Sequence, residues 1–231
     1  MINKKIRILL MGTSSFAVPS FDALLDCEDW CSVVGLVTQP DKPVGRDQIM
    51  TPPAIAFWAK ENSIPLLQPT TLKDSFAFES IKNLAPDLIL VAAYGKLIPE
   101  SILSIPQFGV INIHPSMLPK YRGPSPIQYA ILNGDDATGI SIMVIDKEMD
   151  HGPLIYQEKV PLNQTETFEE LYGHLAQKTA TFIGSILKDF VDGTISPIPQ
   201  NDADATFTKL VTTEDGKLDF LTQTAQSLDQ K

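Results

Sequence analysis

Residues 87–93 and 108–113 read DLILVAA and FGVINI, and these two runs decide the fold. Each is almost continuously apolar and is bounded by proline or glycine, which is typical of a strand covered on both faces within a parallel sheet. Residues 6–11 (IRILLM) and 33–38 (VVGLVT) have the same character. Stretches with apolar residues at helical spacing separate these runs. The alternation predicts an α/β fold with a Rossmann-like, doubly wound and mostly parallel sheet.

The rest of the chain continues this alternation up to about residue 193. Further strands are expected at residues 64–68, 139–145 and 154–159. Helices are expected at residues 16–27, 54–62, 73–84, 126–133, 167–191 and 221–228, with a proline-rich loop at 39–53. From residue 194 onward the sequence is polar and is interrupted by prolines. We therefore assign residues 1–193 to one domain and residues 194–231 to a linker followed by the start of a C-terminal region.

Composition narrows the class of protein. The chain has 231 residues, of which 43% are hydrophobic and 20% charged, so disorder is excluded as its dominant state. A net charge of −10 argues against tight, non-specific nucleic-acid binding by the chain as a whole. Two cysteines cannot form a disulfide framework or a four-thiolate zinc site. No apolar run approaches the 18 residues of a membrane span. We expect a soluble, cytoplasmic monomer that binds neither a membrane nor a metal.

The turn after the first strand, GTSSFAVPS at residues 12–20, argues against a dinucleotide cofactor. The dinucleotide fingerprint requires three glycines, and only Gly12 is present. A phosphate-binding P-loop motif is also absent from the sequence. Ser14 is expected either to cap the following helix or to contact a ligand.

Asn112 and His114 carry the strongest chemical signal. They are two residues apart at the carboxyl end of a predicted strand, so they project to the same side, where open α/β sheets bind ligands. The alternative is a hydrogen-bonded pair that holds the next loop. Asp150 follows another strand, and a carboxylate beside His114 would fix its tautomer and favour its protonated form. Lys120 and Arg122 either contact an anionic group or are solvated.

Several motifs share a resemblance to one superfamily. They are MGTSSFAVPSFDALL (11–25), VTQPDKPVGR (37–46), DLILVAAYGKLIP (87–99), GVINIHPSMLPKYRGPSPIQYAI (109–131), MDHGPLI (149–155) and TKLVTTEDGKLDF (208–220). Through them the chain resembles the folate-dependent formyltransferases and, among these, the methionyl-tRNA formyltransferases. The resemblance implies a formyltransferase fold and formyl transfer from 10-formyltetrahydrofolate to the amine of methionyl initiator tRNA.

The resemblance also implies roles for individual residues. Asn112, His114 and Asp150 match the catalytic trio, in which Asn112 and protonated His114 would stabilise an oxyanion and Asp150 would help to take a proton from the amine. The residues expected to bind the folate are Tyr94, Gly95, Leu97, Ser116, Leu118, Pro119, Ile142 and Val144. The residues expected to contact the methionyl-tRNA are Ser14, Phe16, Lys42, Arg46, Lys120 and Arg122.

Two departures from the family pattern lower the expected affinity for tRNA. Asp47 follows Arg46, where the family has glycine and lysines, and the sequence ends at Lys231, where the family continues into a further C-terminal domain. We therefore expect either a fragment or a naturally short form. Four alternatives remain open. They are formyl transfer to a nucleotide-linked amino sugar, formyl transfer to glycinamide ribonucleotide, hydrolysis of the formyl donor, and an inactive folate-binding or tRNA-binding module.

Overall fold

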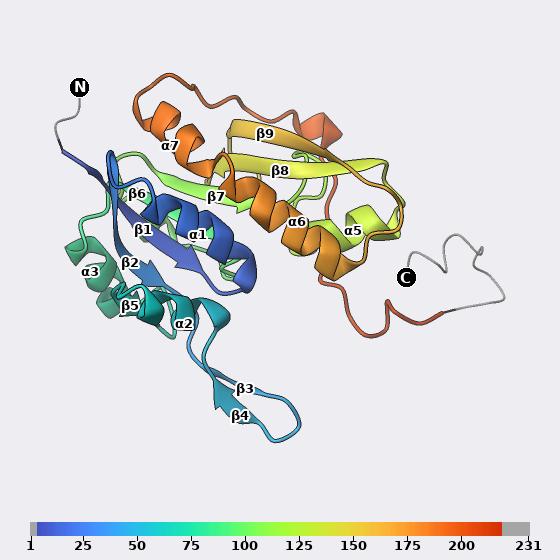
Figure 1. The fold of residues 1–231 in the computed structure, drawn as a ribbon, viewed down its shortest axis with the longest axis horizontal. Helices are drawn as coiled ribbons and strands as arrows, with labels where there is room; N and C mark the ends of the chain where they lie inside the picture. The colour runs from blue at the N-terminus through green and yellow to red at the C-terminus, as the bar shows by residue number, and fades with distance from the viewer. Residues whose placement is uncertain (1–3, 219–231) are drawn as a thin grey trace.

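A computed structural model describes residues 4–218 of the chain and contains one large sheet (Figure 1). The strand order is β5-β2-β1-β6-β7-β8-β9. The strand bounds are β1 (Ile6–Gly12), β2 (Cys31–Val37), β5 (Leu66–Leu67), β6 (Leu88–Ala92), β7 (Val110–His114), β8 (Ala137–Val144) and β9 (Leu154–Pro161). Neighbouring strands from β5 to β7 are parallel, whereas β8 and β9 are antiparallel. The prediction of a mostly parallel α/β sheet is therefore confirmed.

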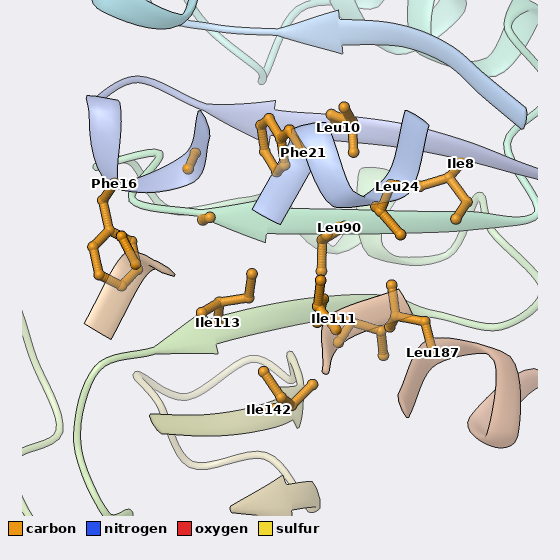
Figure 2. Close-up of a cluster of buried hydrophobic side chains, with 14 of the residues drawn as sticks. Ile8, Leu10, Phe16, Phe21, Leu24, Leu90, Ile111, Ile113, Ile142 and Leu187 are labelled. Atoms are coloured by element: carbon orange, nitrogen blue, oxygen red, sulfur yellow. The ribbon is translucent and has the colours of Figure 1, made fainter. Parts of the chain in front are cut away.

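Helices cover both faces of this sheet. Their bounds are α1 (Val18–Leu25), α2 (Ala54–Glu61), α3 (Ser75–Asn83), α4 (Glu100–Leu103), α5 (Pro126–Leu132), α6 (Phe168–Ala180) and α7 (Ile183–Val191), with short 3-10 helices η1 (Ser15–Ala17) and η2 (Asp202–Asp204). Strand β1 shows how side chains divide between the faces. Ile8 and Leu10 join the larger core with residues of α1, α2, α6 and α7 (Figure 2), whereas Leu9 and Met11 join the smaller core with residues of α3 and α4.

The predicted helix at residues 167–191 is two helices, α6 and α7. Helix α6 begins with a capping box between Thr167 and Glu170, which satisfies free N–H groups of its first turn. The break falls at Phe182, whose φ of −132° is not helical. The ring of Phe182 packs against Tyr156 of β9, with ring centroids 5.0 Å apart. This tertiary contact redirects the chain where the sequence pattern alone continues a helix.

The loop expected at residues 39–53 contains a β-hairpin that extends away from the sheet (Figure 1). Strands β3 (Lys42–Val44) and β4 (Ile49–Thr51) pair in antiparallel fashion. Gly45 and Gln48 at the turn have positive φ values of 74° and 48°. The proline within β3 masked this strand in the sequence, although an isolated two-stranded ribbon tolerates a missing N–H donor.

Beyond residue 193 the described chain returns to the sheet. Ile198 pairs with Leu154 of β9, and Phe207 pairs with Arg122 in the loop after β7. The division of the chain at residue 193 stays a prediction, and the helix expected at residues 221–228 lies outside the described residues. Within residues 4–218 no helix combines the length and the apolar character that a membrane span requires.

Candidate active site

Asn112 and His114 lie at the carboxyl end of β7 and line a cavity of about 730 Å³. This volume falls within the range of small-molecule binding sites. The residues that line the cavity come from the ends of β6 and β7, the turn after β6, the loop after β8, η1, and helices α5 and α6. The cavity therefore lies at the sheet edge where open α/β folds bind ligands.

The His114 side chain is almost completely buried, at 4% exposure, and both ring nitrogens have a neighbour. Nε2 is 2.9 Å from the carbonyl oxygen of Tyr121. Because a carbonyl oxygen only accepts, Nε2 carries a hydrogen and donates it. Nδ1 is 3.7 Å from Oδ1 of Asp150 and is therefore the ring atom that can exchange a proton. The backbone of Tyr121 fixes the tautomer, a role that the sequence analysis gave to Asp150.

Asp150 reaches His114 from the loop after β8, 36 positions along the chain. Its Oδ2 accepts a hydrogen bond of 2.8 Å from the backbone N–H of Gly123. Asp150 has a φ of 49°, a left-handed conformation that a non-glycine residue keeps only where its surroundings hold it. Asn112 is half-buried, and within residues 4–218 its side-chain amide makes no hydrogen bond. An uncommitted amide donor thus lies beside a paired imidazole and carboxylate.

Three aromatic residues that line the cavity, Phe16, Phe168 and Tyr172, pack together. The rings of Phe16 and Tyr172 have centroids 5.3 Å apart, and those of Phe168 and Tyr172 are 5.4 Å apart. The backbone N–H of Phe16 donates to the Tyr172 hydroxyl at 2.6 Å. Sequence reasoning proposed Phe16 but missed Phe168 and Tyr172, whose spacing on α6 is equally typical of core residues.

Part of the cavity wall comes from the turn after β6, where Tyr94, Gly95 and Leu97 all line the cavity. Gly95 has a φ of 76°, and a Cβ there would lie 3.0 Å from Nε2 of Gln39. The Tyr94 ring is buried in the smaller core, and burial raises the pKa of its hydroxyl to about 12. We therefore assign the backbone of this turn, rather than the phenol, to the wall.

Five of the residues expected to bind the folate do not line the cavity. They are Ser116, Leu118, Pro119, Ile142 and Val144. Ser116 is fully buried and donates to the carbonyl of Lys120. Along β8 the sequence prediction is one residue out of phase, because side chains alternate between the faces and Met143 lines the cavity instead of Ile142. We replace Ile142 and Val144 with Met143 and Ile145.

Lys120 and Arg122 are committed to protein carboxylates and are absent from the cavity lining. Lys120 Nζ lies 2.8 Å from Asp135, and Arg122 Nη2 lies 2.8 Å from Asp202. Arg122 is only 4% exposed, so its charge is used inside the fold. The expectation that Arg122 contacts an anionic ligand is therefore corrected, whereas the expected contact of the exposed Lys120 with tRNA stays a prediction.

The remaining candidates, Ser14, Lys42 and Arg46, do not line the cavity. Lys42 and Arg46 belong to the projecting hairpin, where Lys42 Nζ contacts Oε1 of Gln39 at 2.6 Å and Arg46 is exposed at the tip. Ser14 precedes η1 but does not cap it through its side chain, and its buried Oγ has no hydrogen-bond partner among the described residues. Ser14 is not part of the cavity lining.

His151, next to Asp150, lies between the carboxylates of Asp146 and Asp202, a contact that the sequence analysis did not predict. Its Nδ1 lies 2.6 Å from Asp146 and its Nε2 lies 3.4 Å from Asp202. The hydrogen bond to Asp146 raises the pKa of His151 above 6.5, and the charges of Asp202 and Glu148 act in the same direction. The contacts with Arg122 and His151 lower the pKa of Asp202 below 3.8.

A stability difference that depends on pH follows from the raised pKa of His151. Its stabilising contribution is fully present below the unfolded value of 6.5 and is lost as the pH rises through the folded pKa. His151→Gln should lower the melting temperature by up to about 2–4 °C at pH 6, because an exposed ion pair contributes little. The difference from wild type should shrink toward pH 9, which thermal unfolding at several pH values measures. A difference that grew with pH would contradict the assignment.

Metal binding has no support within the described part of the chain. Among residues 4–218, no three or more His, Cys, Asp or Glu side chains are grouped so that they could hold a metal ion.

Comparison with known proteins matches the chain to one family and to relatives that share one name. Residues 4–187 match the family described as Formyl transferase. The chain is 42% identical over 215 residues to a methionyl-tRNA formyltransferase of Chloroflexus aurantiacus, a match that covers 93% of this chain and 69% of that protein. A methionyl-tRNA formyltransferase of Bacillus cereus is 38% identical, with 93% and 68% coverage.

Solved structures share the fold at lower sequence identity. A sugar N-formyltransferase from Shewanella has a TM-score of 0.74 and 18% identity, over 97% of this chain and 86% of that one. A phosphoribosylglycinamide formyltransferase from Bacillus halodurans has a TM-score of 0.68 and 23% identity, over 81% and 96%. At these identities the likeness supports the fold and no finer assignment.

Proposed function

The chain belongs to the formyl transferase family and, within it, to the methionyl-tRNA formyltransferases, and we propose that it transfers a formyl group from 10-formyltetrahydrofolate to the amino group of methionyl initiator tRNA. The observation that carries the proposal is that Asn112, His114 and Asp150 line the same cavity, with His114 Nδ1 3.7 Å from Asp150. The family relationship gives the reaction, and the geometry supports the roles that we propose for these residues.

The reaction replaces one carbon–nitrogen bond with another. The acceptor amine attacks the formyl carbon, a new C–N bond forms, and the carbonyl oxygen becomes an oxyanion. When the oxyanion collapses, the bond between the formyl carbon and N10 of the folate breaks. The amine loses a proton and N10 gains one, so the overall transfer needs no oxidant or metal.

Three side chains are placed for these changes. The Asn112 amide is free to donate a hydrogen bond to the developing oxyanion, and a proton on Nδ1 of His114 would serve the same oxygen. Nε2 cannot do so, because it donates to Tyr121. Asp150 is oriented by the Gly123 N–H and can accept the proton from the amine, directly or through a water.

Two groups of residues that line the cavity suit the two substrates. The wall made by the turn of Tyr94 and Gly95, with Met143 and Ile145 beside it, would bind the heterocycle of the folate. The rings of Phe16, Phe168 and Tyr172 would accept the thioether of the methionine, because sulfur packs favourably against aromatic rings. These seven residues and Asn112, His114 and Asp150 together make up the proposed substrate site.

Contact with the tRNA is assigned to the hairpin, where Arg46 is exposed. Each neutralised phosphate contributes about −0.9 to the slope of log affinity against log salt. We therefore expect Arg46→Ala to raise the KM for methionyl-tRNA, to reduce that salt slope by about 1, and to leave kcat unchanged. Lys60→Ala, an exposed change on α2, is the matched control. An equal salt slope in wild type and Arg46→Ala would remove the hairpin from the tRNA contact.

The substrate also bears on location and assembly. Because initiator tRNA is aminoacylated in the cytoplasm, we place the protein there. We propose that it acts as a monomer.

The test is an acceptor comparison with radiolabelled 10-formyltetrahydrofolate. Methionyl initiator tRNA, a nucleotide-linked amino sugar and a reaction without acceptor are run in parallel. Transfer of label to the tRNA, even with weak affinity, supports the proposal. Label on the amino sugar alone, or release of formate without acceptor at the same rate, would overturn it.

A further inference from the structure

Residues 198–208, here called the clasp, run alongside the loop of residues 119–123 that follows β7. At one end, Ile198 and Leu154 exchange two backbone hydrogen bonds of 2.8 Å. At the other, the N–H of Arg122 donates to Thr206 at 2.9 Å and the N–H of Thr208 donates to Arg122 at 2.8 Å. The clasp thus adds a short strand-like layer to a loop located about 80 residues earlier in the chain.

The loop under the clasp supplies the backbone partners of two catalytic side chains. The carbonyl of Tyr121 accepts from His114, and the N–H of Gly123 donates to Asp150. The clasp approaches this loop closely at Gly123, where φ is 114° and a Cβ would lie 2.7 Å from Oγ1 of Thr208. A shift of the clasp would therefore move the groups that orient His114 and Asp150.

Gln200 connects the clasp directly to the catalytic loop. Its Oε1 accepts from Nε and Nη2 of Arg122 at 3.1 and 2.9 Å. Its Nε2 donates to the carbonyls of Asp150 and Gly152 at 2.9 and 2.8 Å. The orientation of the amide is defined by its neighbours, because a guanidinium only donates and a carbonyl only accepts. All four contacts are thus made by one half-buried side chain.

Resting on the proposed function, we propose that Gln200 is a positioning residue for Asp150, holding its backbone so that the carboxylate stays between Gly123 and His114. The left-handed backbone of Asp150 needs such support. Gln200 does not line the cavity, so it acts through Asp150 and touches no substrate. Arg122 has the related role of holding the amide from its other side.

The discriminating variant is Gln200→Glu. A glutamate keeps the shape of the side chain and its pairing with Arg122, but it cannot donate to the carbonyls of Asp150 and Gly152. We expect kcat to fall about 10²-fold, the effect of a misplacement of about 1 Å, with both KM values unchanged. Asn201→Ala is the matched control. Asn201 is exposed, and among the described residues its side chain forms hydrogen bonds only with Ala203 and Asp204. It should retain wild-type kcat.

Hydrogen exchange gives a readout that does not depend on activity. If Gln200 positions Asp150, the Gly123 amide should exchange faster in Gln200→Glu than in wild type or Asn201→Ala. Unchanged exchange together with wild-type kcat would overturn the inference, as would equal losses in both variants. If wild type transfers no formyl group to methionyl-tRNA while Gln200→Glu still exposes the Gly123 amide, the proposed function fails and the positioning role stands.

Discussion

Asp150→Asn should lower kcat by about 10²–10⁴-fold, the range typical of a lost general base. Asparagine has the shape of aspartate, and its Oδ1 can still accept from the Gly123 N–H, which Asp150 contacts at 2.8 Å. The substitution removes the negative charge that faces Nδ1 of His114 at 3.7 Å and the oxygen that would take the amine proton. KM for both substrates should change little, because the carboxylate binds a transferring proton rather than either substrate.

Steady-state kinetics with methionyl initiator tRNA measures this effect. Asp136→Asn provides the matched control, since Asp136 is exposed and does not line the cavity. A melting temperature close to wild type would show that the loop is intact. A kcat for Asp150→Asn within about threefold of wild type would remove Asp150 from the proton transfer.

Asn112→Ala should lower kcat by about 10²–10³-fold while substrate binding is largely kept, because an oxyanion donor acts mainly in the transition state. Its amide makes no hydrogen bond within the described residues, so the loss should not arise from a broken internal contact. Asn112→Asp, which has similar shape but an acceptor in place of the donor, should lose at least as much.

Single-turnover kinetics separate this chemical step from binding and release. Asn83→Ala, at the exposed end of α3, is a suitable control for the loss of an asparagine side chain. An Asn112→Ala enzyme with the wild-type rate would eliminate Asn112 as the oxyanion donor.

The fold could be predicted because its signal is local. Strand β6 is apolar along its whole length, and β1 and β7 are apolar apart from Arg7 and from Asn112 and His114, which follows directly from burial on both faces. The spacing of Asn112 and His114 likewise places both on one side of β7 by the period of two. Their proximity to Asp150 depended on topology. Strand β8 runs antiparallel beside β7 and ends next to Ile111, and the loop that follows β8 brings Asp150 back to His114 and Gly123.

What the sequence could not provide depends on distant partners. Arg122 in a proline-rich loop looks like a solvated cation, and only the return of residues 200–202 beside it makes it a buried one. The wrong face was assigned to Ile142 because β8 is buried on both faces and its polar residues Thr138 and Ser141 lie on opposite faces, so the sequence does not mark which face lines the cavity. The break before α7 follows from the packing of Phe182 on Tyr156, which no local propensity indicates.

The late position of the clasp in the chain has a consequence for biosynthesis. The contacts between residues 121–125 and the clasp span sequence separations of 78–86 residues. At a synthesis rate of about 5–20 residues per second, roughly 4–17 s pass between the emergence of the two partners from a ribosome. During this interval the sheet can already form, but the loop that orients His114 and Asp150 lacks its contacts with the clasp. A nascent chain therefore acquires its core before its catalytic geometry, and the enzyme becomes competent only when residue 208 has been released from the exit tunnel.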